Sequence, residues 1–234
     1  LTPPGLLEMS ERLGMPFGVL QEPSTGTAPS MAAAAPPADA DDAESVAAPP
    51  LSWPQRAEVC VAGSAGQRIR SAAGVLGEIA VAGGLHAVQQ DDFPITVRKG
   101  HSISNLIVDA APIDYIALDH PQLVVILSDD GATRLGPLDE LEPSCLVLAA
   151  RGVVLPATAA RVVTIDIDQL GRSVGRASAA LAATAAGVVL RCWITGATLL
   201  AAAGASLTGR FREANLKAVA AGVELADATV PAAR

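Results

Sequence analysis

The sequence contains little lysine, few aromatic residues and few cysteines. Lysine occurs only at Lys99 and Lys217, so the clustered cations that bind nucleic-acid phosphates are missing and we exclude a nucleic-acid-binding protein. Cys60, Cys145 and Cys192 lie far apart and include no Cys-x-x-Cys pair for zinc or an iron–sulfur cluster. We therefore predict that the chain holds no metal and that its cysteines are reduced, as in a cytoplasmic protein.

We also find neither a secretory signal nor a membrane span in the hydrophobic pattern of the sequence. The chain starts at Leu1 rather than Met, without the basic and apolar regions of a signal sequence, which suggests a fragment or a processed chain. The apolar run of residues 177–207 approaches the length of a membrane span, but Arg191 lies in its middle and alanine contributes little to insertion. We predict buried helices there and no association with a membrane.

Small aliphatic residues, by contrast, are abundant. Half of the chain is hydrophobic (50%) although only 3% is aromatic, a composition typical of an α/β sheet covered by alanine-rich helices. The net charge of −8 is unevenly spread, because residues 1–58 carry eight carboxylates against Arg12 and Arg56. The remainder of the chain is therefore nearly neutral.

The composition divides the chain into three segments. Residues 1–22 contain a short apolar stretch broken by glycine and proline, which is too small to form a core. Residues 23–52 are alanine, proline, serine, threonine and acidic residues, and we predict a disordered linker because they offer almost nothing to bury. Residues 53–228 are predicted to form the folded domain.

The folded domain opens with a predicted strand at residues 58–62, a glycine turn, a helix from Ile69 to Gly83 and a second strand at residues 85–89. Such a β-α-β unit predicts a parallel strand pair with a right-handed crossover. Further strands are expected at residues 103–108, 123–127, 145–148 and 161–165, with a short helix at 131–141. After Asp166 we expect helices to the end of the chain, with breaks near Gly187 and Gly204. The predicted fold is a three-layer, Rossmann-like, open and mostly parallel sheet with helices on both faces.

The turn Gly63-Ser64-Ala65-Gly66-Gln67 lies where a dinucleotide-binding fold carries its phosphate loop. That function also requires a third glycine and an acidic residue at the end of the second strand, where Gln89 and Gln90 stand and Asp91 is the nearest acid. The alternative, which we favour, is a strand-to-helix turn that needs small residues for packing.

Histidine and aspartate supply the other candidates. His101 beside Ser102, with Asp92 or Asp109 to orient the imidazole, could form a nucleophilic site, but adjacent residues of an extended segment point to opposite faces. We favour a structural or interface histidine at this position, and also at His86 and His120. Asp129-Asp130-Gly131 follows a strand and could hold a metal or a ribose, although a helix cap is the better interpretation. We predict no catalytic residue in this chain.

Two segments resemble the γ module of the 2-oxoacid:ferredoxin oxidoreductases, which act on pyruvate, 2-oxoglutarate or ketoisovalerate. They are residues 61–67, Val-Ala-Gly-Ser-Ala-Gly-Gln, and residues 93–102, Phe-Pro-Ile-Thr-Val-Arg-Lys-Gly-His-Ser. The family shows Gly-x-Gly-Gly-Gln-Gly at the first site, and an aromatic, Pro or Gly, then Glu-x-Arg-Gly-Gly at the second. The strand at 103–108 followed by Ala111-Pro112-Ile113 is also similar, and the resemblance covers about residues 58–225. Residues 3–7 and 14–20 resemble the C-terminal tail of the family's β subunit, so the chain reads as part of a β–γ fusion.

The resemblance implies an accessory, structural role in oxidative decarboxylation of a 2-oxoacid to an acyl-CoA. Thiamine diphosphate, Mg, iron–sulfur clusters and coenzyme A would belong to the partner α, β and δ modules, with ferredoxin as electron acceptor. It implies no cofactor in this chain, and the weak candidates for ligand contacts are Gly63, Gly66, Gln67, Arg98, His101 and Ser102. Ala65, Arg68, Thr96 and Lys99 depart from the family's pattern, which suggests a divergent copy. The alternative function is a stand-alone nucleotide-binding regulator on the same scaffold.

Overall fold

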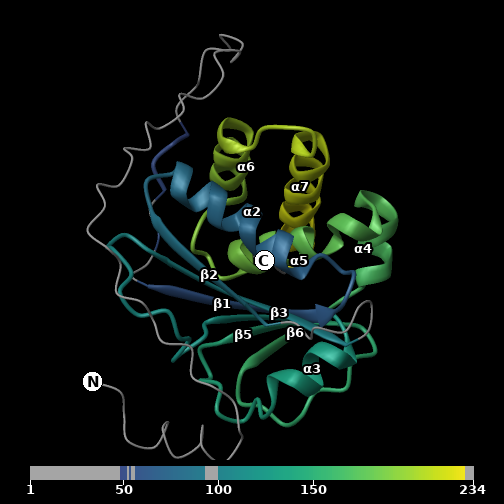
Figure 1. Ribbon diagram of the computed structural model, residues 1–234. Coiled ribbons are helices and arrows are strands. Elements are labelled where there is room, and N and C mark those ends of the chain that lie inside the picture. Colours follow the sequence, from purple (N-terminus) through teal and green to yellow (C-terminus); the bar gives the residue numbers. More distant parts are fainter. Residues whose placement is uncertain (1–47, 52, 54–55, 93–99, 230–234) are drawn as a thin grey trace, which may run out of the picture. The chain divides into compact units, whose positions relative to one another are not determined.

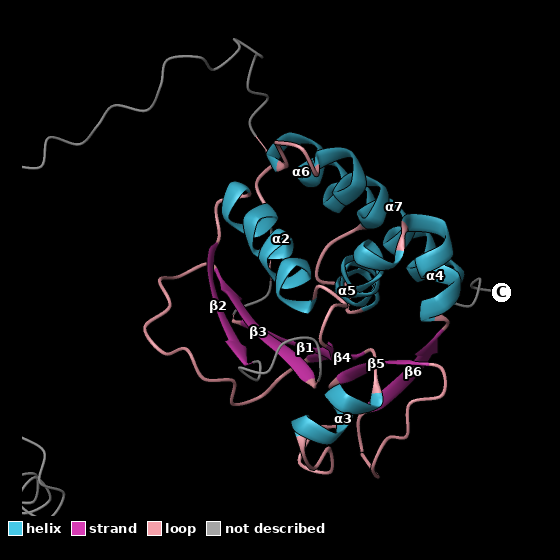
Figure 2. Cartoon of the chain, turned by 45° about the vertical axis from the view of Figure 1, so that its right-hand side comes forward, coloured by secondary structure: helices cyan, strands magenta, loops and turns pink. Residues whose placement is uncertain are grey.

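A six-stranded sheet forms the centre of the protein, whose structure, a computed structural model, describes residues 48–51, 53, 56–92 and 100–229. Figure 1 shows the strands in the middle of the fold, and Figure 2 labels all six in their spatial order, β2-β3-β1-β4-β5-β6. The strands are β1 Ala57–Ser64, β2 His86–Asp92, β3 His101–Asp109, β4 Leu123–Ile126, β5 Leu146–Ala150 and β6 Arg161–Ile165. Strands β1, β4, β5 and β6 pair in parallel, whereas β3 is antiparallel to both β1 and β2. The sheet is therefore mixed but mostly parallel, as predicted.

Helices cover the two faces of the sheet unequally (Figure 2). They are α2 Ile69–Ala82, α3 Asp129–Leu135, α4 Ile167–Val174, the 3-10 turn η1 Arg176–Ser178, α5 Ala179–Leu190, α6 Gly196–Ser206 and α7 Arg212–Thr229. Helix α3 lies on one face, and the other helices lie on the opposite face, with α5 between the sheet and α7. The predicted three-layer α/β architecture is confirmed, and its helical layers differ in thickness.

The order of the first strands differs from the prediction. Strand β2 does run parallel to β1, but β3 lies between them and pairs with both, with β1 over residues 101–108 and with β2 over residues 103–109. The reason is burial. Leu106 and Ile107 of β3 point to opposite faces of the sheet and are each only 1% exposed, so β3 is buried on both faces, and such a strand belongs in the interior of the sheet. Strand β2 is polar and half-exposed, which suits the edge.

Helix α5 is buried on almost every side and runs through Gly187 without a break. A Cβ at Gly187 would lie 2.8 Å from both Cδ atoms of Leu123 on β4, so the glycine allows the helix to approach the sheet. The breaks fall instead at Gly175, whose φ is +89°, and in the segments that flank α6. The predicted break at Gly187 is wrong because close packing, rather than a turn, requires that glycine.

The predicted N-terminal tail (residues 1–22) and almost all of the predicted linker (residues 23–52) lie outside the described residues. Packing begins before Trp53, because Leu51 is buried at 7% exposure and its N–H donates to Gly83 O at 3.0 Å. Within the described part of the chain, no single helix is long and apolar enough to cross a membrane; α4 with η1–α5 passes on length and composition, but the pair is bent by 113°.

Candidate functional site

The glycine turn between β1 and α2 lies at the edge where the parallel strands end. Gly66 has a φ of +96°, and no atom lies within 4 Å of the position that its Cβ would occupy. The backbone conformation, not lack of space, therefore requires glycine at this position. At Gly63, by contrast, lack of space requires glycine, because a Cβ there would lie 2.7 Å from Ile69 Cδ1 and would also collide with the Gln67 side chain.

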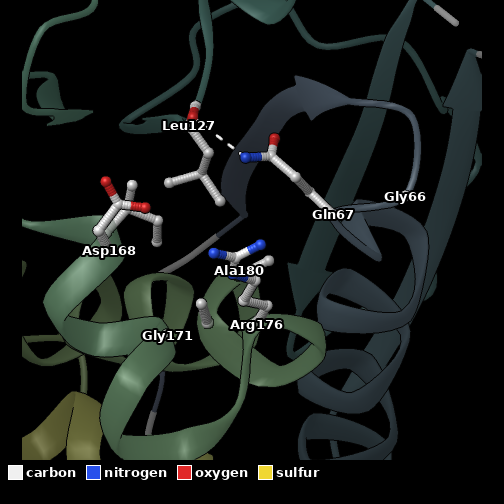
Figure 3. Close-up of a pocket in the computed structure, with 9 residues that line it drawn as sticks. Gly66, Gln67, Leu127, Asp168, Gly171, Arg176 and Ala180 are labelled. Carbon is white, nitrogen blue, oxygen red and sulfur yellow. Dashed lines mark hydrogen bonds between the residues drawn. The ribbon is translucent and has the colours of Figure 1, made fainter.

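Gln67 uses its amide group to close the turn. Its Oε1 accepts from the Ser64 N–H at 2.7 Å, and its Nε2 donates to the Leu127 carbonyl at the end of β4 at 3.3 Å. The side chain thus joins the ends of β1 and β4, as Figure 3 shows for Leu127. This arrangement supports the packing interpretation of the motif, since the group that would face a ligand is engaged within the fold.

Arg68 occupies the last position of the motif, where the resembling family has glycine. Its φ and ψ are 57° and 36°, the left-handed region that favours glycine, and it precedes α2 without a side-chain cap. The guanidinium Cζ lies 5.5 Å from the centroid of the Phe211 ring. The family's preference for glycine here therefore has a backbone cause, which this chain overrides.

A cavity of about 340 Å³ opens beside the turn. It lies where β1 continues into α2 on one face and β4 into α3 on the other, the switch point at which open α/β sheets bind ligands. Figure 3 shows the polar side chains of Gln67, Asp168 and Arg176 at this cavity, together with apolar ones such as Leu127 and Ala180. The lining residues are Gly66, Gln67, Leu127, Ile167, Asp168, Gly171, Arg176, Ala179 and Ala180.

Dinucleotide binding is not supported by this geometry. In a Rossmann fold the acidic residue ending the second strand reaches the ribose beside the first strand. Here β3 separates β2 from β1, and the Asp91 carboxylate is already engaged by Ser104 Oγ at 2.6 Å, Gln89 Nε2 at 2.8 Å and Arg70 Nε at 3.0 Å. That carboxylate cannot serve a ribose without losing those partners.

The end of the second motif, residues 100–102, lies beside the glycine turn because β3 pairs with β1. His101 and Ser102 pair with Ser64 and Gly63 of β1, and the Ala65 N–H donates to Gly100 O at 2.8 Å. The structure therefore brings Gly63, Gly66, Gln67, His101 and Ser102 to one edge of the sheet. Arg98, Thr96 and Lys99 lie outside the described residues.

His101 belongs to a charged cluster rather than to a nucleophile. Its Nε2 lies 3.5 Å from Asp92 Oδ2 and 3.3 Å from Arg134 Nε, and Arg134 also pairs with Asp92 at 2.7 Å. Asp109 lies at the far end of β3 and accepts from the Ala111 N–H. The contacts join α3 to the sheet and support the structural interpretation of His101.

A polar network at the end of β4 was missed by the sequence interpretation. Ser64 Oγ lies 2.8 Å from both Ser128 Oγ and Asp130 Oδ2. Ser128 caps α3 by accepting from the Gly131 N–H at 3.3 Å. A helix forms here as expected, but it spans Asp129–Leu135 rather than residues 131–141, and the predicted aspartates lie in its first turn instead of capping it. Asp129 accepts from the Val154 N–H at 3.0 Å. Only the fold brings β1 and β4 together, so no local pattern showed this network.

Two of the three cysteines, Cys60 and Cys145, are buried, whereas Cys192 is exposed. Burial raises the pKa of the Cys60 thiol to about 12, with a smaller contribution from Cys145, and burial raises that of Cys145 to about 11. Both thiols are therefore protonated and poor nucleophiles at neutral pH. Among the described residues, no three His, Cys, Asp or Glu side chains gather as a metal site would require.

An open α/β sheet with a glycine turn at its switch point defines a Rossmann-like protein. Residues 58–225 match the family described as "Pyruvate ferredoxin/flavodoxin oxidoreductase", and the chain belongs to this family.

Solved structures share the fold. A keto/oxoacid ferredoxin oxidoreductase gamma subunit from Geobacter sulfurreducens is 24% identical, with a TM-score of 0.60 over 74% of this chain and 97% of that one. The pyruvate oxidoreductase subunit PORC from Thermotoga maritima is 16% identical, with a TM-score of 0.57 over 73% of this chain and 96% of that one. A 2-oxoglutarate:ferredoxin oxidoreductase from Magnetococcus marinus is 18% identical, with a TM-score of 0.60 over 76% of this chain but only 32% of its own. None of the curated proteins matches the chain.

Proposed function

We propose that this chain is the accessory γ module of a thiamine-diphosphate-dependent 2-oxoacid:ferredoxin oxidoreductase that converts a 2-oxoacid to an acyl-CoA. The observation that carries the proposal is the family match over residues 58–225, together with a fold that spans almost the whole of the Geobacter gamma subunit. We take the module to run from Leu51 to residue 228, because Leu51 is already buried in the domain. Residues 23–50 join it to residues 1–22, which resemble the tail of a β subunit.

The role is structural rather than catalytic. The amide of Gln67 is engaged within the turn, His101 lies in an ion cluster, and the thiols of Cys60 and Cys145 are buried. None of these candidates has the access and the partners that a general base or nucleophile needs. Thiamine diphosphate, Mg, iron–sulfur clusters and coenzyme A are held by the α, β and δ modules, and electrons leave to ferredoxin. The protein works in the cytoplasm.

The edge of the sheet at Gly63, Gly66, Gln67, His101 and Ser102 is the part of the module that faces its partners. Loops at this edge carry binding in open α/β folds. Arg98 lies four residues after Pro94 and three before His101, in the segment that joins β2 to β3, and we assign it to a contact with the β module or with coenzyme A.

A reconstitution assay tests the proposal. The chain alone should not reduce viologen with any 2-oxoacid and coenzyme A, whereas its complex with the α, β and δ modules from the same host, which include the thiamine-diphosphate module, should do so. Stoichiometric binding of a nucleotide by the chain, with no association with that module, would instead support the stand-alone regulator.

A further inference from the structure

Two arginines stack on an exposed aromatic ring at the C-terminal edge of the sheet. Arg68 Cζ lies 5.5 Å and Arg210 Cζ lies 4.5 Å from the Phe211 ring centroid, and Phe211 is 44% exposed. We call these three residues the Arg–Phe–Arg surface. It joins the start of α2 to the start of α7.

The charge of this surface is not neutralised within the described residues. Arg56, Arg70, Arg134 and Arg151 each pair with a carboxylate. No such ion pair involves Arg68 or Arg210, and Glu213, in the first turn of α7, forms none with them. Two cations therefore face solvent together in a domain that is otherwise nearly neutral.

The backbone of Arg68 carries a cost that its local fold does not require. A left-handed conformation costs an ordinary residue about 1 kcal/mol or more, and glycine would avoid that cost at this position. Among the described residues the guanidinium makes no hydrogen bond or ion pair, and it lies over the half-exposed Phe211 ring. The strained arginine is thus better explained by something outside the chain than by the stability of the domain.

The shape of the surface favours a protein over a small ligand. The hollow between α2, η1 and α7 beside Phe211 has a volume of about 30 Å³, room for only a few water molecules and too little for a nucleotide or a similar ligand. Exposed arginine and phenylalanine are the residues that protein interfaces select, and the planar guanidinium matches a carboxylate with two parallel hydrogen bonds.

We propose that the Arg–Phe–Arg surface is a docking site for a carboxylate-bearing surface of a partner protein module. The proposal rests on the proposed function, since it supplies the contact by which a γ module is held in its complex. Arg68 and Arg210 form ion pairs with the partner's Asp or Glu side chains, and Phe211 fills the apolar space between those pairs.

Calorimetric titration of the full chain with the thiamine-diphosphate module of its own complex tests this site. Arg68→Asn removes the charge but keeps a residue that tolerates the left-handed conformation, and Arg210→Gln removes the second charge. The double variant should bind at least about tenfold more weakly, with a smaller dependence of affinity on salt. Arg161→Gln, on the exposed edge strand β6 at the opposite end of the strands, is the matched control and should bind like wild type.

The outcomes separate a failure of the docking site from a failure of the proposed function. If wild type binds and the double variant binds within twofold at an unchanged thermal midpoint, the docking site is wrong and the proposed function stands. If wild type itself does not bind the module, both fail. A thermal shift with inorganic pyrophosphate that the double variant abolishes would assign the surface to a phosphate ligand instead and would overturn the proposal.

Discussion

At the scale of single residues, two neighbours in one turn should respond to substitution in opposite directions. Gly66 and Arg68 both have positive φ values, of +96° and 57°, but only Gly66 is the residue that this conformation favours. Gly66→Val should lower the free energy of unfolding by about 2 kcal/mol, because a β-branched side chain is strained at such a φ. Arg68→Gly should leave it unchanged or raise it by up to about 1 kcal/mol. Urea denaturation of both variants measures this, and a loss for Arg68→Gly as large as that for Gly66→Val would contradict it.

Glu58 is a buried carboxylate with a full set of partners. It is 2% exposed and accepts from Arg56 Nε at 2.7 Å and from the N–H groups of Asp119 and His120 at 2.9 and 2.8 Å. Glu58→Ala should cost about 3 kcal/mol, since three donors lose their acceptor in a closed site. Chemical denaturation is the measurement, with Glu224→Ala on the exposed side of α7 as the control.

The three cysteines should differ sharply in reactivity. Cys192 is exposed, whereas Cys60 and Cys145 are buried and have thiol pKa values raised from 9.0 to about 12 and about 11. A thiol reagent at pH 8 should label one cysteine in the native protein and three after unfolding. Folding raises the pKa of the two buried thiols, so it is favoured while they are protonated. Their contribution to the free energy of unfolding is fully present below pH 9 and should be lost as the pH rises from about 9 towards about 12. Rapid native labelling of all three would show that the buried thiols are accessible.

At the scale of elements, the order in which strands lie was harder to predict than their existence. The six predicted strands and the Ile69 helix all form, because short apolar runs mark most of the strands and a helical hydrophobic period marks the helix. The position of β3 between β1 and β2 depends on which strands are buried on both faces of the sheet. The polar side chains of β2 were the signal that β2 is the edge strand.

The candidate site divides in the same way. The glycines of the turn were predictable from their spacing, since positive φ and close packing restrict a position to glycine. The Gln67 contact to Leu127 and the Phe211 contact to Arg68 join residues far apart in sequence, and no local pattern could predict them. The same holds for the network of Ser64, Ser128 and Asp130.

The start of the folded domain can be located by truncation. Leu51 packs against Gly83, and its burial suggests that the fold begins there rather than at Trp53. Removal of residues 1–47 should shift the thermal midpoint by less than about 2 °C, whereas Leu51→Ala should cost about 2 kcal/mol of unfolding free energy. A large loss on truncation would mean that part of residues 1–47 packs on the domain.

At the scale of the whole molecule, the fold presents its glycine turn, the cavity beside it and the Arg–Phe–Arg surface at one end of the sheet. The buried core behind that end is built from small aliphatic side chains and has no described metal-type cluster. These features gather at one end of the sheet, which fits the proposed role of a module that binds its partners there.

Assembly is therefore the most direct measurement of what this protein does. The chain should be co-expressed with the thiamine-diphosphate module of its host and examined by sedimentation velocity at micromolar concentration. We expect one species that contains both polypeptides in equal amounts and that sediments far ahead of the 23.6 kDa chain alone. A chain that sediments by itself in the presence of excess module, at low and at physiological salt, would contradict its assignment as a γ module.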